Sequence, residues 1–328
     1  MIRYLLAACL LVLTACGSGS SGDNAAAPQS GTNASAFPVT IDHKFGSTTI
    51  KAEPKRVAVV GLMEQDALLA LGIVPVATTQ WIKSFDAAIP PWSAGKLGSA
   101  PKPTMLVDDG AGPQFEKIAA LRPDVIIGLY AGLTQENYDK LSKIAPVVAQ
   151  PKEYPDYGIG WQELTRKVGQ IVGKSAEAEK LVTDSEALIT KARKDNPKFE
   201  GATAVVATTW EGYFVYGSQD PRTRLLHSLG FKSPPQLDEA IGGQFGASIS
   251  KERTDLLDQS VMIWLAGDQT KAILDADPLY TSLKVAKEKR DILIQESSEY
   301  GSAMSFISVL SLPFLLEKYV PQLAAAVK

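Results

Sequence analysis

Short apolar runs alternate with helix-like segments along most of the chain after Arg56. In the first half, the apolar runs are Val57–Val60, Val74–Thr78, Asp124–Gly128 and Pro146–Ala149, with helix-like segments at Glu64–Leu71, Phe115–Leu121 and Gln135–Ile144. Strands that are apolar throughout and separated by helices are typical of βαβ units, in which helices cover both faces of a parallel sheet. The first half of the chain is therefore predicted to be an α/β lobe.

The same alternation returns after residue 200. Strands are predicted at Ala202–Thr208, Val261–Ala266 and Asp291–Gln295, and helices at Thr223–Leu229 and Ser302–Tyr319, the latter crossed by Pro313. The chain is therefore predicted to be an α/β protein of two similar lobes with parallel central sheets. We assign residues 37–173 to the N-terminal lobe and residues 198–328 to the C-terminal lobe.

A long amphipathic segment, Ser175–Asn196, lies between the two predicted lobes. Its small and apolar positions recur every three or four residues along one helix face: Ala178, Leu181, Val182, Ser185, Leu188, Ile189 and Ala192. Ser175 is a candidate N-cap, and Pro197 ends the pattern. At 1.5 Å per residue such a helix is about 30 Å long, so residues 174–197 are predicted to form a rigid connecting helix and a stiff hinge.

The first residues are typical of a secretory signal peptide. Arg3 precedes the apolar stretch Leu5–Val12, which runs into Leu13-Thr14-Ala15-Cys16. A charged start, a short apolar core and small residues before a cleavage point define such a signal, whereas a membrane-spanning helix needs about 20 apolar residues. The ending resembles the bacterial lipoprotein signal, in which the Cys is lipidated; the alternative is a cleavable signal with a chance Cys. Residues 1–15 are therefore predicted to be removed, leaving Cys16 as the lipidated N-terminus.

Cysteine usage and composition support an anchored, exported domain. The two cysteines are Cys9, inside the signal, and Cys16, so no disulfide is expected in the mature fold even though export would permit one. Residues 16–36 contain almost no large apolar side chain and are predicted to be a flexible tether. The lipid would hold the protein on the outer face of the cytoplasmic membrane, since each buried CH₂ group contributes roughly 0.8 kcal/mol.

Charge and motif content argue against nucleic-acid binding and catalysis. The chain has 33 Lys and Arg against 36 Asp and Glu, without the basic block or aromatic–basic motif that nucleic-acid-binding proteins use. It has no Gly-x-Ser-x-Gly elbow, no His-Glu-x-x-His motif and no P-loop. His43 and His227 are its two histidines, too few for a His-rich zinc site. We therefore expect neither an enzyme nor a resident metal or cofactor.

Several segments, in a fixed order, resemble one family. They are Pro54–Val59, Asp66–Val76, Phe115–Ile127, Ile144–Val148, Ile249–Glu252 followed by Leu256–Asp258, and Asp277–Tyr280. Together, from Phe45 onward, the sequence resembles the iron-siderophore and cobalamin class of substrate-binding lipoproteins that serve ABC importers. The segment Ser305–Pro313 is most similar to the actinobacterial ferric-siderophore branch.

The resemblance implies two Rossmann-like lobes with a ligand cleft between them. It implies that a monomer captures a ferric siderophore in this cleft and delivers it to an ABC permease, with iron present only as part of the ligand. A haem or cobalamin carrier is the alternative within the class, since a tyrosine can ligate haem. A structural or adhesive surface lipoprotein is the alternative from a different class.

Aromatic residues gather where the predicted strands end, which is where α/β sheets place their ligands. They are Trp81, Tyr130, Tyr154, Trp210, Tyr213 and Tyr300. Aromatic faces offer contact area to a bulky, partly apolar ferric siderophore at a small entropic cost, so we predict that this set lines the cleft. For each residue alone, burial in the core is an equal alternative.

Three charged residues complete the predicted sites. Arg222, directly after Pro221, is a candidate for neutralising an anionic ferric complex; a solvated helix start is the alternative. The resemblance implies that Glu116 and Glu252, one in each lobe near the start of a helix, contact arginines of the permease, because rim charges steer docking. The alternative is that each glutamate only favours the positive end of its helix.

Overall fold

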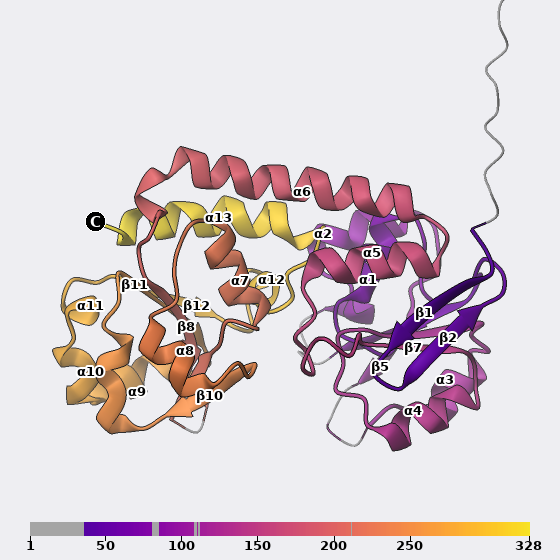
Figure 1. Cartoon of the computed structure of the whole chain (residues 1–328), viewed down its shortest axis with the longest axis horizontal. Helices are drawn as coiled ribbons and strands as arrows, with labels where there is room; N and C mark the ends of the chain where they lie inside the picture. Colours follow the sequence, from indigo (N-terminus) through magenta and orange to yellow (C-terminus); the bar gives the residue numbers. More distant parts are fainter. Residues whose placement is uncertain (1–35, 81–84, 108–109, 111, 211) are drawn as a thin grey trace, which may run out of the picture. The chain divides into compact units, whose positions relative to one another are not determined.

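The computed structural model describes residues 36–80, 85–107, 110, 112–210 and 212–328 (Figure 1). The predicted signal peptide, Cys16 and nearly all of the predicted tether lie outside this part of the chain, as does Trp81. Residues 35–328 form one compact unit. Among the described helices, none is both long enough and apolar enough to cross a membrane.

The first half of the chain builds a five-stranded parallel sheet in the order β5-β4-β3-β6-β7. Its strands are β3 (Val57–Val59), β4 (Ala77–Gln80), β5 (Thr104–Val107), β6 (Val125–Gly128) and β7 (Val147–Ala149). The predicted run Val74–Thr78 becomes a strand only from Ala77, because Pro75 has no N–H to donate to a ladder. Strand β5 is additional to the predicted set.

Helices and one hairpin surround this sheet. The helices are α1 (Glu64–Ala70), α2 (Pro91–Ala94), α3 (Phe115–Ala120), α4 (Gln135–Ser142) and α5 (Trp161–Ile171), with single turns η1 (Asp86–Ala88) and η2 (Gly95–Leu97). The hairpin pairs β1 (Val39–His43) with β2 (Gly46–Ile50). Helices α1, α3 and α4 confirm the predicted segments, and Thr134 caps α4 by accepting a hydrogen bond from the backbone N–H of Asn137.

The second half builds another five-stranded sheet, in the order β10-β9-β8-β11-β12. The strands β8 (Ala204–Thr208), β11 (Val261–Ala266) and β12 (Asp291–Gln295) run parallel, as predicted. The strands β9 (Tyr213–Tyr216) and β10 (Gly246–Ile249) are antiparallel additions to the predicted strands, and they make the second sheet mixed. The connection from β8 to β9 is too short for a crossover, and a short connection allows only antiparallel pairing.

Helices of the second half lie around this mixed sheet. They are α7 (Pro221–Ser228), α8 (Pro235–Ile241), α9 (Thr270–Ala276), α10 (Pro278–Ser282), α11 (Lys284–Lys287), α12 (Glu299–Ser305) and α13 (Ser311–Ala326), with single turns η3 (Pro197–Phe199) and η4 (Lys251–Leu257). The predicted helix Ser302–Tyr319 is therefore two helices, α12 and α13. Pro313 lies in the first turn of α13, where its missing N–H removes no helical hydrogen bond.

The connecting segment is the helix α6 (Ser175–Asp195). It packs on α5 in the first half of the chain and on α7 and α13 in the second (Figure 1). Its buried residues are divided accordingly: Ala178 belongs to the core of the N-terminal lobe, and Val182 and Ile189 belong to that of the C-terminal lobe. Ser175 is the first helical residue, and Lys174 occupies the N-cap position without a side-chain cap, which corrects the predicted cap.

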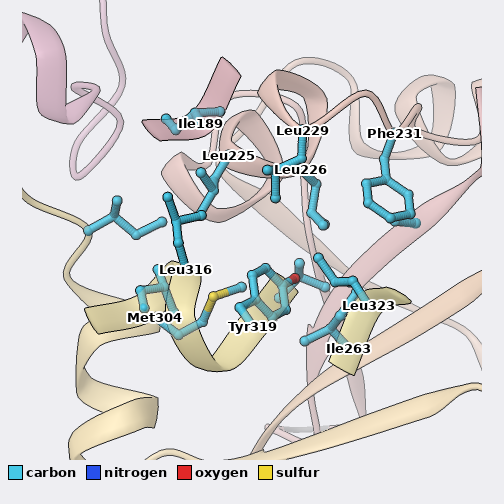
Figure 2. Packing of buried hydrophobic residues seen from close by; sticks show 14 of the residues in the cluster. Ile189, Leu225, Leu226, Leu229, Phe231, Ile263, Met304, Leu316, Tyr319 and Leu323 are labelled. Carbon is cyan, nitrogen blue, oxygen red and sulfur yellow. The ribbon is translucent and has the colours of Figure 1, made fainter. Parts of the chain in front are cut away.

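The core of the C-terminal lobe joins α6, α7, α12 and α13 to the sheet (Figure 2). Labelled members of this cluster are Ile189, Leu225, Leu226, Leu229, Phe231, Ile263, Met304, Leu316, Tyr319 and Leu323. Burying one large apolar side chain of this kind contributes about 1.5–3 kcal/mol. The helix α13 is therefore held to the C-terminal lobe by packing along its whole length.

A buried carboxylate links α1 to the segment between α12 and α13. Asp66 Oδ2 accepts hydrogen bonds from Ser308 Oγ at 2.5 Å and from Trp92 Nε1 at 2.9 Å. Asp66 and Ser308 are each 4% exposed and lie 242 positions apart in the sequence. Burial raises the pKa of Asp66, while the hydrogen bonds from Ser308 and Trp92 act in the opposite direction. The bridge ties the N-terminal lobe to the C-terminal part of the chain.

We expect Ser308→Ala to lower the free energy of unfolding by about 1–3 kcal/mol, because a buried carboxylate loses a donor. The Ser308 hydroxyl also accepts from the backbone N–H of Ser311, and this bond is lost as well. Urea denaturation measures the change. Ser47→Ala, at an exposed position of β2, is the control and should change stability by less than about 0.5 kcal/mol. Equal changes in the free energy of unfolding for the two substitutions would contradict the stabilising role of the bridge.

Candidate ligand-binding cleft

A cavity of about 650 Å³ is lined by side chains from both lobes, a size typical of small-molecule sites. Its lining residues are Leu62, Gly110, Tyr130 and Tyr157 from the N-terminal lobe and Trp210, Tyr216, Arg222, Phe245, Ser305 and Phe306 from the C-terminal lobe. A smaller cavity of about 280 Å³ shares Leu62, Gly110 and Tyr157 with it and continues into the N-terminal lobe. Among the described lining residues, aromatic side chains dominate, with one guanidinium and one serine hydroxyl.

The cavity lies where strands of both sheets end. Leu62 follows β3, Tyr130 follows β6, and Trp210 follows β8. In open α/β sheets, the carboxyl ends of parallel strands leave a crevice that binds ligands. The position of the cavity therefore follows from the direction of the strands, as the sequence predicts.

Glu64 fixes the backbone of the N-terminal wall. Its buried carboxylate accepts hydrogen bonds from the backbone N–H groups of Leu129 (2.5 Å), Tyr130 (2.9 Å) and Met63 (3.0 Å). A Cβ on Gly61 would lie 2.1 Å from Glu64 Oε1, so only glycine leaves room for the carboxylate there. Burial raises the pKa of Glu64, although the backbone donors favour the charged form. Glu64 therefore holds Tyr130 at the cavity without lining it.

Tyr157 stands beside Tyr130 in an uncommon backbone conformation. Its φ of 59° is in the left-handed region, which residues other than glycine seldom adopt and which occurs often at binding sites. The two tyrosine rings meet edge to face, 5.5 Å apart. A Cβ on Gly132 would lie 3.1 Å from the Tyr157 ring, so glycine at this position allows the ring to pack closely.

Aromatic rings of the C-terminal wall contact one another in sequence. Trp210 lies 5.9 Å from Phe214, Phe214 lies 5.4 Å from Tyr216, and Tyr216 lies 5.8 Å from Phe245, measured between ring centroids. Trp210 is 63% exposed, which is unusual for so large an apolar side chain. The row leaves an aromatic surface open to a ligand.

Arg222 forms a buried ion pair at the centre of this wall. Its Nε and Nη2 donate to the two carboxylate oxygens of Asp220 at 2.7 and 2.5 Å, and the guanidinium lies 3.7 Å from the centroid of the Tyr216 ring. Asp220 also caps α7 by accepting from the backbone N–H of Arg222. Burial acts to lower the pKa of Arg222, but the neighbouring carboxylate outweighs it and holds this pKa above its ordinary value.

Three comparisons with known proteins bear on this arrangement. The family model described as periplasmic binding protein matches residues 57–297. The chain belongs to the periplasmic binding protein family. YhfQ of Bacillus subtilis is 29% identical to this chain over 275 residues, which are 82% of this chain and 79% of YhfQ. Its name describes it as an ABC transporter substrate-binding lipoprotein.

Solved structures of similar proteins agree with the fold. A periplasmic solute binding protein from Mycobacterium smegmatis is 34% identical, with a TM-score of 0.76, covering 88% of this chain and 99% of that chain. PiaA of Streptococcus pneumoniae in complex with ferrichrome is 29% identical, with a TM-score of 0.78, covering 88% of this chain and 98% of that chain. The two-lobed α/β architecture of the periplasmic binding proteins is thereby confirmed for this chain.

The structure brings three predicted ligand residues of this family member together: Tyr130, Trp210 and Arg222 all line the cavity. Tyr154 is not among the lining residues; its ring lies 5.4 Å from the guanidinium carbon of Arg224. That guanidinium also donates to the backbone carbonyl of Gly158 at 2.6 Å, which adds a second link between the lobes. The ligand contacts of all these residues stay predictions.

Two further predicted residues lie outside the cavity. Tyr213 is 4% exposed in the core, where its hydroxyl donates to Asp277 at 2.6 Å. Side chains alternate between the faces of a strand, so Tyr213 points to the core and Tyr216 points to the other face of β9. Tyr300 packs on the C-terminal core, with its hydroxyl 3.3 Å from Gln322. Core packing is thus the structural role that each of them has here.

Four aromatic cavity residues are additional to the predicted set: Tyr157, Tyr216, Phe245 and Phe306. For Tyr216, period-two alternation within Tyr213–Tyr216 is the pattern that distinguishes the cavity face from the core face. The other three residues do not lie in a strand, and no local sequence pattern identifies them as cavity residues.

The remaining predicted residues lie on the surface or in ordinary polar contacts. Glu116 is the second residue of α3 and Glu252 the second of η4, and both are exposed. His43 contacts Thr48 and His227 contacts Ser233 through hydrogen bonds, and burial lowers the pKa of both imidazoles. The described part of the chain holds no group of three or more His, Cys, Asp or Glu side chains that could bind a metal ion.

We expect the buried Glu64 to make stability depend on pH. Because its pKa is raised above the ordinary 4.5, its contribution to folding is fully present below pH 4.5 and is lost as the pH rises through the folded-state pKa. The stability of the wild type minus that of Glu64→Gln should therefore decrease as the pH rises above 4.5. Urea denaturation at a series of pH values measures this difference.

The control for this measurement is Glu136→Gln. Glu136 is exposed, and Lys140 lowers its pKa through a hydrogen bond. Any change of stability with pH that Glu136 causes therefore has the opposite direction, and it is small because of solvent screening. If the stability of the wild type minus that of Glu64→Gln rises with pH, the backbone donors outweigh burial at Glu64.

Proposed function

We propose that this chain is the substrate-binding lipoprotein of an ABC importer, capturing a ferric siderophore in the cleft and delivering it to the permease. The observation that carries this proposal is the aromatic cavity of about 650 Å³, walled by both lobes, in a member of the periplasmic binding protein family. The relative that has been solved with ferrichrome shares this fold at 29% identity. Capture without chemical conversion is the role proposed for the cleft.

The lining of the cavity suits a chelate of this kind. Trp210, Tyr216 and Phe245 offer aromatic faces to the apolar backbone of a siderophore. The guanidinium of Arg222 has five N–H donors. Asp220 accepts two of them and Tyr216 interacts with another, so Arg222 can still donate to the oxygens that surround the iron. The iron would enter only as part of the ligand, so the protein needs no metal site of its own.

Anchoring completes the proposal. Lipid on Cys16 would fix the mature N-terminus to the outer face of the cytoplasmic membrane, and residues 16–36 would tether the binding unit there as a monomer. The similarity to YhfQ, whose name describes a substrate-binding lipoprotein, supports this arrangement. The anchor would keep a loaded cleft close to the permease, which raises the effective concentration of one for the other.

The proposal is tested by titrating the full chain, held in detergent, with ferrichrome, ferric dicitrate, a ferric tris-catecholate, haem and cobalamin while following tryptophan fluorescence. We expect quenching by ferrichrome, because Trp210 lines the cavity. Trp210→Ala should weaken binding about tenfold, the usual scale for an aromatic contact at an interface. Leu279→Ala, which removes a 48% exposed apolar side chain of α10, is the control and should leave the affinity unchanged.

Other outcomes of this titration identify the alternatives. A Soret band on adding haem, lost when Tyr130 or Tyr157 is changed to Phe, would favour a haem carrier. Saturable binding of cobalamin alone would favour a cobalamin carrier. Silence with every ligand would refute capture and favour a structural or adhesive role.

Docking on the permease is tested separately from ligand binding. We expect Glu116→Ala combined with Glu252→Ala to abolish most ferric-siderophore uptake by cells while leaving the ligand affinity of the purified chain unchanged, because both residues are exposed and neither lines the cavity. Glu136→Ala is a matched control, since Glu136 is likewise an exposed second residue of a helix. Normal uptake by the double variant would refute the docking role.

A further inference from the structure

The charges around the cleft bear on which ferric chelates it accepts. Some relatives are named for Fe(3+)-citrate binding and others for iron(3+)-hydroxamate binding. Membership of the family therefore does not indicate which class of ferric chelate this chain binds. The two classes differ in charge. Three singly charged hydroxamates neutralise a ferric ion, whereas citrate and catecholate complexes keep negative charge.

Arg222 carries the one formal charge among the described residues that line the cavity. It is not a free cation, because Asp220 neutralises it through two hydrogen bonds. The Arg222 side chain is 7% exposed and that of Asp220 is 0% exposed, so water does little to screen the pair. The half-buried Glu296 also interacts with the charge of Arg222.

The neighbouring cation does not alter this balance. Arg224 is held by the carbonyl of Gly158 and by Gln219, and it does not line the cavity. By sequence, the internal segments outside the described residues carry Lys83 against Asp108, Asp109 and Glu211. They add no excess of positive charge to the chain.

Neutral donors and aromatic faces make up the rest of the wall. Ser305 is 4% exposed, lines the cavity, and its Oγ has no hydrogen-bond partner within the described residues. A buried hydroxyl without a partner is uncommon, and here a ligand oxygen would supply one. Trp210 and Phe245 contribute apolar surface. Such a wall can solvate partial charges but offers no compensation for a net negative charge.

We propose that the cleft selects a ferric chelate without net negative charge, of the hydroxamate type, over the anionic citrate and catecholate types. This inference rests on the proposed function and narrows it. An anionic complex would lose hydration on entering the cavity and would meet an arginine whose charge is already matched. A neutral trihydroxamate would lose less hydration, while its oxygens could accept hydrogen bonds from Arg222 and Ser305.

The first test compares ligands on the full wild-type chain in detergent. Ferrichrome and ferrioxamine B serve as trihydroxamate chelates, and ferric dicitrate and a ferric tris-catecholate serve as anionic chelates. We expect the trihydroxamates to bind at least about tenfold more tightly than either anionic chelate. The affinity for ferrichrome, which is neutral, should also change little with added salt, because screening weakens only interactions between net charges.

The second test changes the charge of the pair. Asp220→Asn keeps a side-chain oxygen that can cap α7 but leaves Arg222 without its counterion, so the preference for trihydroxamates over anionic chelates should fall about tenfold. Asp184→Asn, at an exposed ion pair with Lys180 on α6, is the matched control and should leave the preference unchanged. If Asp220→Asn does not fold, the wild-type ranking decides alone.

The outcomes separate this inference from the proposed function. Tighter binding of ferric dicitrate or the tris-catecholate than of both trihydroxamates would overturn the inference while leaving siderophore capture intact. Binding of no ferric chelate would overturn the proposed function itself. An unchanged preference in a folded Asp220→Asn protein would show that the ion pair does not set the selectivity.

Discussion

The spacing of the two cleft walls depends on the hydrogen bonds that Asp66 accepts. Leu62, on the N-terminal wall, comes four positions before Asp66, and Phe306, on the C-terminal wall, comes two positions before Ser308. Because Ser308 donates to Asp66 across the lobes, the bridge joins the two segments that carry these wall residues. Helix α6 supports the same spacing from outside, since its buried face is shared between the two cores.

Each wall is rigid for a different reason. On the N-terminal side, Glu64 binds the backbone that carries Tyr130, so the ring is positioned by hydrogen bonds that no ligand needs to form. On the C-terminal side, the short helix α7 begins at Pro221, and its cap Asp220 also holds the arginine that faces the cavity. A site built from preorganised groups loses little conformational entropy when it binds.

Much of the fold follows from local patterns, but the cavity does so only in part. Apolar runs such as Val261–Ala266 predict buried strands, because parallel strands that are covered on both faces consist almost entirely of apolar residues. The strand Tyr213–Tyr216 escapes this rule, since it is antiparallel and only every second side chain is buried. Asp220-Pro221-Arg222 carries a recognisable cap signal, whereas Phe245 and Phe306 reach the cavity through tertiary contacts that no local pattern encodes.

The bridge between Asp66 and Ser308 also has an evolutionary consequence. Its two residues stand 242 positions apart, in segments that belong to different lobes. A recombination event that replaced one lobe with that of a distant relative would separate the pair and leave the buried carboxylate with Trp92 but without the donor from the other lobe. Substitutions in the walls leave this bond intact, whereas exchange of a whole lobe breaks it.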